Sequence, residues 1–256
     1  MYDWPEVRSA TNKLWQSIAI AFSRHGISVP PALDRSIPVE KVWRSPNLLL
    51  AQTCGLPYVR YLRDTVRILG VMAYDLSGCR TGEYHSVLVV HQAAAISELK
   101  ACRGVRVAIN SDDSYSGCLA LDRRVATFFE GTFFGERIPT GSHRESIRAV
   151  ARGIADLAAI DCVAWALALK HEPATERVRV MGTTNSRPGL PLITSSSRSN
   201  ADCEAIQAAL EEAVVQLERS SRDALRLLAF VRREETDYDC IVADEQRVAQ
   251  SSVNSR

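Results

Sequence analysis

The feature that most constrains the fold is an alternation of short apolar runs with helix-like segments over residues 104–171. GVRVAIN precedes a predicted helix that begins near Ser116, FFGERIPT precedes one at Ser142, and LAAID precedes CVAWALALKH. Strands that alternate with helices are typical of a parallel or mixed sheet covered by helices. We therefore predict an α/β fold.

Further elements are expected on both sides of this region. Apolar residues at helical spacing predict a helix from about Pro5 to His25, and Gly26 follows as a stop. Apolar runs bounded by Gly, Pro or polar clusters predict strands within 47–53, 66–74, 84–90, 177–184 and 189–195. Two amphipathic helices are expected next, the second carrying Leu225, Leu228 and Val231. The polar residues 241–256 are typical of a flexible C-terminal tail.

The composition argues against several classes of function. A net charge of +1, from 31 basic and 30 acidic residues, gives no reason to expect nucleic acid or an anionic membrane as partner. No apolar run approaches the ~20 residues that span a bilayer, and MYDWPEVRSATNK lacks the pattern of a secretory signal. We therefore expect no membrane insertion, and a cytoplasmic location for the chain as written.

The seven cysteines are odd in number and scattered, which favours reduced thiols over a disulfide framework. No CxxC pair or His/Cys cluster stands out in the sequence, so no metal site is predicted. No cofactor is expected either.

Polar residues that suit an anion stand at each of the three predicted strand-to-helix junctions. A helix N-terminus offers unpaired N–H groups and the positive end of the helix dipole. Serine and aspartate are also the usual helix caps, so capping alone explains any single junction. Three junctions along one edge of a sheet favour a ligand site. The residues concerned are Ser114, Ser116, Gly117, Ser142, His143 and Asp161.

With these residues identified, the chain resembles the phosphate/phosphonate-binding subunits of ABC transporters, a branch of the type 2 periplasmic binding protein superfamily. The resemblance rests on MYDWPE, QTCGLPY, YHSVLVV, AINSDDSYSG, GSHRESIRAVARGIADLAAIDCVAWAL and PGLPLIT. It implies a type 2 periplasmic-binding-protein-like fold, with two α/β lobes and a ligand cleft between them. Lobe 1 would comprise residues 1–90 and 187–240, and lobe 2 residues 91–186.

The resemblance also implies which residues contact the ligand. In the family, the Ser-x-Ser-Gly helix start, the histidine of a Ser-His pair and an aspartate before the next helix hold the oxyanion. An aromatic residue near the N-terminus and the loop from Gln52 would belong to the other lobe, although a tight turn also explains that loop. The expected ligand-binding residues are Tyr2, Gln52, Thr53, Ser114, Tyr115, Ser116, Gly117, Ser142, His143 and Asp161.

The implied function is a non-catalytic solute-binding protein for ABC-type uptake. It would clamp a small oxyanion, such as phosphate, phosphite or an organophosphonate, and its protein partner would be an ABC permease. Asp112 and Asp113 would repel that anion unless both point to solvent. Family members carry a secretion signal or a full first strand before the position of MYD, so an upstream start would place the protein in the periplasm or envelope.

Two alternatives remain open at this point. The first is a cytosolic ligand sensor of the same fold that acts on a regulator protein. The second is a transferase or hydrolase that uses Cys162 with His143 and Asp161. No G-x-S-x-G elbow or other nucleophile motif accompanies Cys162, which argues against this second alternative.

Overall fold

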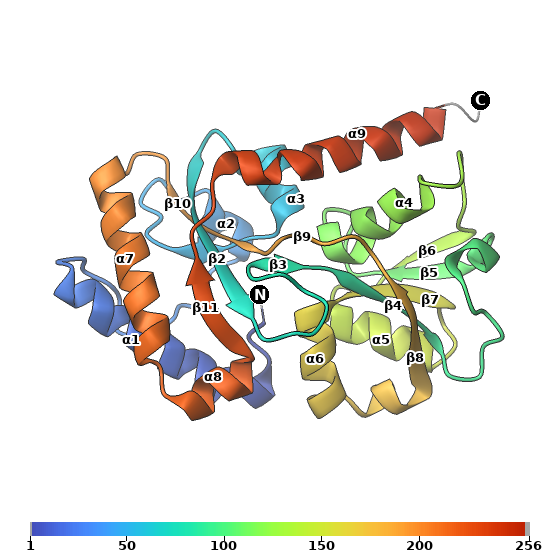
Figure 1. The fold of residues 1–256 in the computed structure, drawn as a ribbon, viewed down its shortest axis with the longest axis horizontal. Coiled ribbons are helices and arrows are strands. Elements are labelled where there is room, and N and C mark those ends of the chain that lie inside the picture. The colour runs from blue at the N-terminus through green and yellow to red at the C-terminus, as the bar shows by residue number, and fades with distance from the viewer. Residues whose placement is uncertain (1, 254–256) are drawn as a thin grey trace. The chain divides into compact units, whose positions relative to one another are not determined.

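The computed structural model describes residues 2–253, and the chain divides into two compact units (Figure 1). Unit 1 consists of Met1–Glu83 and Pro188–Tyr238, and unit 2 of Tyr84–Arg187 and Asp239–Arg256. The chain thus passes between the units three times. The short strands β3 (Glu83–Tyr84) and β9 (Arg187–Pro188), at the first two passages, pair in a two-stranded sheet.

Unit 1 is built on a four-stranded antiparallel sheet in the order β1-β10-β2-β11. Its strands are β1 (Ala51–Gln52), β2 (Val66–Tyr74), β10 (Pro191–Ser195) and β11 (Leu227–Val231). Helix α7 packs on β2 and β11 and against α1, while α8 packs on α1 (Figure 1). The helices are α1 (Arg8–Arg24), α2 (Val39–Trp43), α3 (Gly55–Pro57), α7 (Asn200–Gln216) and α8 (Arg219–Leu225), with short turns η1 (Pro5–Val7), η2 (Tyr58–Leu62) and η6 (Glu235–Tyr238).

One sequence prediction in unit 1 is wrong. The segment with Leu225, Leu228 and Val231 was expected as a single helix, but α8 ends at Leu225 and β11 begins at Leu227. Arg226 between them adopts the left-handed conformation with φ 55°, which ends the helix. The following residues pair antiparallel with β2, and this pairing overrides the helical spacing of their apolar side chains.

Unit 2 contains a mixed five-stranded sheet in the order β6-β5-β7-β4-β8. β5 runs parallel to β6 and β7, whereas β4 is antiparallel to β7 and β8, in line with the predicted parallel or mixed sheet. Its strands are β4 (Ser86–His91), β5 (Arg106–Ile109), β6 (Glu136–Pro139), β7 (Leu157–Asp161) and β8 (Val178–Thr183). The helices are α4 (Ala120–Val125), α5 (His143–Ala151), α6 (Cys162–His171) and α9 (Asp239–Val253), with turns η3 (Leu99–Cys102), η4 (Tyr115–Leu119) and η5 (Pro173–Arg177).

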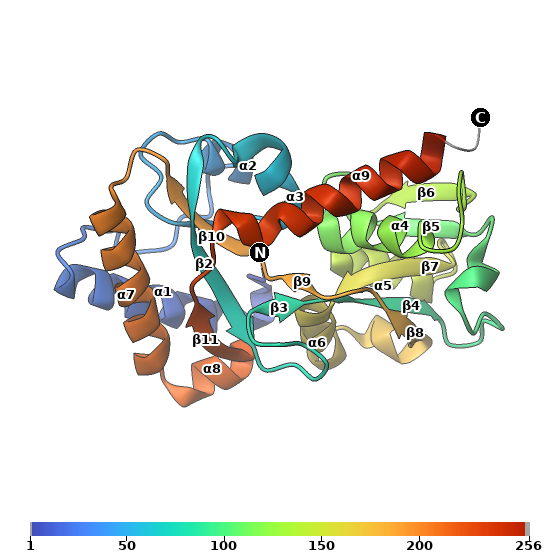
Figure 2. The same cartoon turned by 45° about the horizontal axis from the view of Figure 1, so that its top comes forward.

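Helices cover both faces of this sheet (Figures 1 and 2). On one face, Leu121 and Val125 of α4 join a core that also contains Leu157 of β7 and several phenylalanines. On the other face, α5 packs against β4, β5 and β7 and buries Ile147 and Val150. Because side chains alternate along a strand, the apolar runs of β4, β5 and β7 supply both faces.

The flexible tail expected over 241–256 is a second correction for the residues described. Residues 239–253 form helix α9, which packs on α4 and on turn η4 in unit 2 (Figure 2). Ile241 and Asp244 are fully buried there, and the backbone N–H of Gly131 donates to the carbonyl of Ser251. The segment is polar in composition, and its few buried side chains contact residues that are distant in the sequence. The sequence alone therefore did not show that this segment is held in place. Residues 254–256 lie outside the described part.

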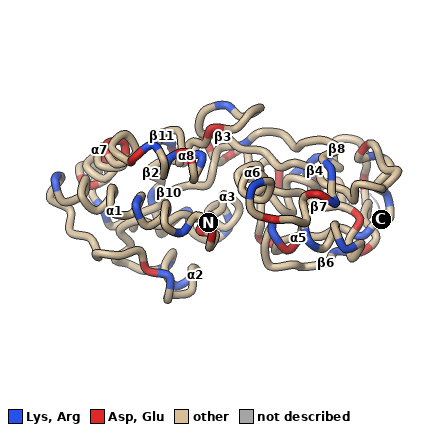
Figure 3. The backbone as a smooth tube through the Cα atoms, turned by 90° about the horizontal axis from the view of Figure 1, so that it is seen from below, with Lys and Arg blue, Asp and Glu red and all other residues tan. Residues whose placement is uncertain are grey.

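Basic and acidic residues are interspersed along both units (Figure 3). This distribution agrees with the net charge of +1 and gives neither unit a run of one sign. Within residues 2–253, none of the helices combines the length and the apolar character needed to cross a bilayer.

Candidate functional site

The three predicted junctions meet at one edge of the unit 2 sheet. β5, β6 and β7 are parallel neighbours, so their carboxyl ends face the same way. Turn η4 follows β5, α5 follows β6 with Ser142 at its N-cap, and α6 follows β7 with Asp161 at its N-cap. The arrangement therefore follows from strand direction, which the alternating pattern of the sequence already predicted.

Ser116 and His143 are in direct contact at this edge. The Oγ atom of Ser116 lies 3.0 Å from Nε2 of His143, a hydrogen bond that joins turn η4 to the first turn of α5. Ser116 is almost fully buried, and its backbone carbonyl accepts a hydrogen bond from the hydroxyl of Ser86 at 2.8 Å. Two residues predicted separately for the ligand site thus form one polar pair.

The ring of His143 lies in a desolvated place although the residue as a whole is half-buried. Its Nδ1 atom is inaccessible to solvent, and no side chain within residues 2–253 forms a hydrogen bond with it. Burial lowers the pKa of His143 to about 4, and a smaller interaction with the backbone of Ala159 acts in the opposite direction. His143 is therefore neutral at pH 7 and can serve as either donor or acceptor toward Ser116.

Asn110, which the sequence analysis did not select, completes this cluster. Its Oδ1 atom is buried and makes no hydrogen bond within residues 2–253. A Cβ atom on Gly117 would lie 1.7 Å from that oxygen and 3.1 Å from Cε1 of His143. Gly117 is thus required by the close packing of Asn110 and His143, whereas the sequence suggested close approach of a ligand. A polar residue directly after an apolar strand was the available signal.

Ser114 and Ser142 act as helix caps. The Oγ atom of Ser114 accepts from the N–H of Gly117 at 3.0 Å, and that of Ser142 accepts from the N–H of Glu145 at 3.1 Å. Ser114 is buried, whereas Ser142 is exposed. Capping uses one acceptor position of each hydroxyl, so each can still donate a hydrogen bond.

Asp161 is buried and caps α6. One of its carboxylate oxygens, Oδ1, accepts from the N–H groups of Val163 at 2.7 Å and Ala164 at 3.1 Å. Asp161 lies opposite Ser86 in the pairing of β7 with β4, and Ser86 in turn donates to Ser116. Ser86 therefore lies beside two of the three junctions, those of Ser116 and Asp161. Sequence reasoning missed it because it lies inside an apolar run.

Tyr115 points away from solvent toward α9. Its hydroxyl donates to Oδ2 of Asp244 at 2.6 Å, and burial followed by this contact raises the pKa of Tyr115 far above its usual range. The neighbouring Asp112 and Asp113 are both exposed. This exposure satisfies the condition that the sequence analysis set for anion binding beside them.

Three predicted ligand residues belong to unit 1. The ring of Tyr2 packs edge-to-face on Tyr74 with 5.3 Å between centroids. The backbone carbonyl of Gln52 accepts from the indole N–H of Trp43 at 3.0 Å, and Thr53 is fully buried next to β10. Their role in ligand binding stays a prediction.

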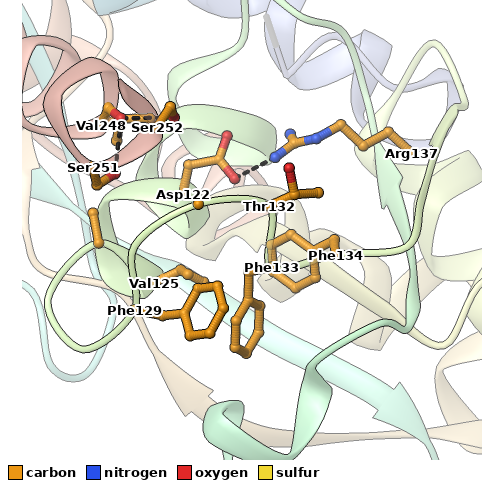
Figure 4. Close-up of a pocket in the computed structure, with 12 residues that line it drawn as sticks. Asp122, Val125, Phe129, Thr132, Phe133, Phe134, Arg137, Val248, Ser251 and Ser252 are labelled. Atoms are coloured by element: carbon orange, nitrogen blue, oxygen red, sulfur yellow. Dashed lines mark hydrogen bonds and ion pairs between the residues drawn. The ribbon is translucent and has the colours of Figure 1, made fainter. Parts of the chain in front are cut away.

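A cavity of about 260 Å³ lies elsewhere in unit 2 and contains none of the predicted ligand residues. Figure 4 shows Asp122 and Arg137 facing each other on one side of it, with the rings of Phe129 and Phe133 on another. Arg137 donates to Asp122 at 2.6 Å, and burial raises the pKa of Asp122 although Arg137 opposes the shift. The ion pair satisfies both charges, so this cavity does not supply an alternative oxyanion site.

Comparison with known proteins gives one family and a consistent fold. Residues 44–239 match the model of a family described as the periplasmic substrate-binding protein of a phosphonate ABC transporter. No curated protein sequence matches the chain.

Solved structures of similar fold cover nearly the whole chain. PhnD1 from Prochlorococcus marinus, in complex with methylphosphonate, is 19% identical with a TM-score of 0.69, and the match covers 94% of each chain. The binding protein of a phosphonate ABC transporter from Pseudomonas aeruginosa is 15% identical with a TM-score of 0.69, covering 95% of this chain and 83% of that one. A Xanthomonas citri protein bound to ATP is also 15% identical, with a TM-score of 0.68 and coverage of 95% and 94%. These matches confirm the predicted type 2 periplasmic-binding-protein-like fold.

Proposed function

The chain belongs to the family of periplasmic substrate-binding proteins of phosphonate ABC transporters, and we propose that it binds an organophosphonate at the Ser116–His143 edge of unit 2. The observation that carries the proposal is the 3.0 Å contact between Ser116 and His143, beside two helix starts that follow parallel strands. That the ligand is clamped between two lobes stays a prediction.

The chemistry of this edge suits a tetrahedral oxyanion. With Nε2–H of His143 donating to Oγ of Ser116, the hydroxyl of Ser116 is a donor for the ligand. The hydroxyls of Ser114 and Ser142 are also free to donate, because their caps use only acceptor positions. The first N–H groups of α5 add a partial positive charge. A phosphonate dianion near the ring would favour protonated His143, so the pKa of His143 would rise on binding.

We propose that the protein binds its ligand without chemical turnover. A serine next to a histidine also occurs in hydrolases, where a carboxylate orients the histidine through its second nitrogen. Here the Nδ1 atom of His143 has no such partner among residues 2–253, and a pKa of about 4 makes the ring a weak base at pH 7. The carboxylate of Asp161 caps α6.

The family description supplies the expected compartment and partner. Members are periplasmic and deliver substrate to an ABC transporter. We propose the periplasm for this protein and the permease of a phosphonate transporter as its partner. Ligand-dependent stimulation of a reconstituted transporter would test the partner.

The binding proposal is tested by thermal unfolding of the purified chain with methylphosphonate, phosphate, phosphite and sulfate. A ligand at about 100 times its dissociation constant should add about 2.7 kcal/mol to the free energy of unfolding. We expect stabilisation by methylphosphonate. Sulfate should stabilise the protein less, because it stays fully deprotonated and none of its oxygens can donate a hydrogen bond. Stabilisation that is lost in Ser116→Ala and in His143→Gln would locate the site. Absence of stabilisation by all four anions at millimolar concentration would overturn the proposal.

A further inference from the structure

A fully buried carboxylate connects the C-terminal helix to the candidate site. Asp244 of α9 is only 2% exposed, yet it accepts four hydrogen bonds. Oδ2 accepts from the hydroxyl of Tyr115 at 2.6 Å and from Nε of Arg187 at 2.7 Å. Oδ1 accepts from Nη2 of Arg187 at 2.6 Å and from Nε of Arg123 at 3.0 Å.

The partners of Asp244 come from three different parts of unit 2. Tyr115 stands between Ser114 and Ser116 in turn η4, which carries the candidate site. Arg123 lies on α4, and Arg187 is the last residue of unit 2 before the chain passes to unit 1. The side chain of Asp244, near the end of the sequence, therefore contacts turn η4, helix α4 and the residue at which the chain leaves unit 2.

The charges of this cluster make its geometry demanding. An unpaired buried carboxylate is strongly destabilising, so Asp244 must keep its donors. The bidentate contact with Arg187 fixes the plane of the carboxylate. The remaining lone pair on Oδ2 then fixes the position of the Tyr115 hydroxyl. The side chain of Tyr115 has only two rotatable dihedral angles, so a fixed hydroxyl also restrains the backbone between Ser114 and Gly117.

We propose that Asp244 is a positioning residue for the oxyanion site: by holding the hydroxyl of Tyr115 it fixes the turn that presents Ser116 to His143 and to the ligand. Helix α9 is then part of the ligand-binding machinery. The inference rests on the proposed function for its ligand, but the positioning of Ser116 against His143 is a property of the free protein.

The test compares Tyr115→Phe, Asp244→Asn and the double variant with the wild-type protein. Titration calorimetry with methylphosphonate should show affinity reduced about five-fold or more in each single variant. The double variant should be no weaker than the weaker single one, because both changes remove the same restraint. Tyr238→Phe is the matched control: its buried hydroxyl donates to the carbonyl of Gly189 in unit 1, and its loss should leave affinity unchanged.

A second readout separates positioning from stability and from ligand identity. The Hε1 chemical shift of His143, measured by NMR without ligand, should move in Tyr115→Phe and stay in place in Tyr238→Phe. Tyr115→Phe keeps the ring and its packing, so it carries the test even where Asp244→Asn does not fold. If wild-type protein binds no phosphonate, the proposed function fails while the NMR comparison still decides the positioning role. Reduced stability in Tyr115→Phe with unchanged affinity and unchanged His143 shift would overturn the inference.

Discussion

The side chain of Asn110 occupies the space that a side chain on Gly117 would need: a Cβ atom on residue 117 would lie 1.7 Å from Oδ1 of Asn110. Real atoms cannot approach so closely, and Cγ of Asn110 would be only 2.6 Å away. The contact joins the end of β5 to turn η4 beside the His143 ring. The size of the side chain at residue 110 therefore determines which side chain residue 117 can carry.

Gly117→Ala should destabilise the protein by about 1–3 kcal/mol, the usual cost of overpacking a closed site. Asn110→Ala combined with Gly117→Ala should recover much of that loss, because the smaller side chain makes room for the added methyl group. Urea denaturation of the two single variants and the double variant measures the coupling. Additive losses would show that the strain arises elsewhere.

Ser114 and Ser116 should respond differently to replacement by alanine. Ser114 caps the helix that follows, so Ser114→Ala should reduce the free energy of unfolding by about 1 kcal/mol. Ser116 contacts His143, and Ser116→Ala should mainly weaken methylphosphonate binding. Calorimetry and chemical denaturation on both variants distinguish the roles. Equal affinity in Ser116→Ala and wild type would remove Ser116 from the ligand site.

Burial of His143 should make stability depend on pH between about 4 and 6.5. Its pKa is 6.5 in the unfolded chain and about 4 in the folded one, so over this range the unfolded state binds more protons. The contribution of His143 is complete above pH 6.5 and is lost as the pH falls toward 4. The upper limit of this loss is about 3 kcal/mol, since one pKa unit corresponds to about 1.4 kcal/mol.

The measurement is the difference in unfolding free energy between wild type and His143→Gln at several pH values. Glutamine keeps a polar group near Ser116 but does not titrate, and carboxylates elsewhere cancel in the difference. The wild-type advantage should shrink as the pH falls from 7 to 4. A difference that is constant with pH would mean that the ring of His143 is solvated in the folded protein.

Two substitutions at Asp161 should separate capping from ligand binding. Asparagine is as good an N-cap as aspartate, whereas alanine is not. Asp161→Ala should therefore lower stability by about 1–2 kcal/mol, and Asp161→Asn should stay close to wild type. If Asp161 also contacts the ligand, Asp161→Asn weakens binding at nearly full stability. Unchanged affinity in Asp161→Asn would leave the residue as a cap only.

The local sequence pattern determined the strands, helices and helix caps around the candidate site. The alternation of apolar runs and helical spacing predicted β5, β6 and β7 and the helices after them. β5 and β7 are inner strands with largely apolar, buried residues, whereas β6 at the edge of the sheet is mostly exposed. The caps at Ser114, Ser142 and Asp161 were equally visible, since capping involves neighbours in sequence. The direction of the strands then placed these residues at one edge.

Tertiary structure decided what depended on distant contacts. Pairing with β2 made a strand of 227–231, and a few buried side chains, Asp244 among them, turned an apparent tail into helix α9. Ser86 and Asn110 entered the site through neighbours in space, which a single sequence does not reveal. The low pKa of His143 likewise comes from the atoms that enclose its ring, because desolvation depends on the packed surroundings of a group and not on its sequence neighbours.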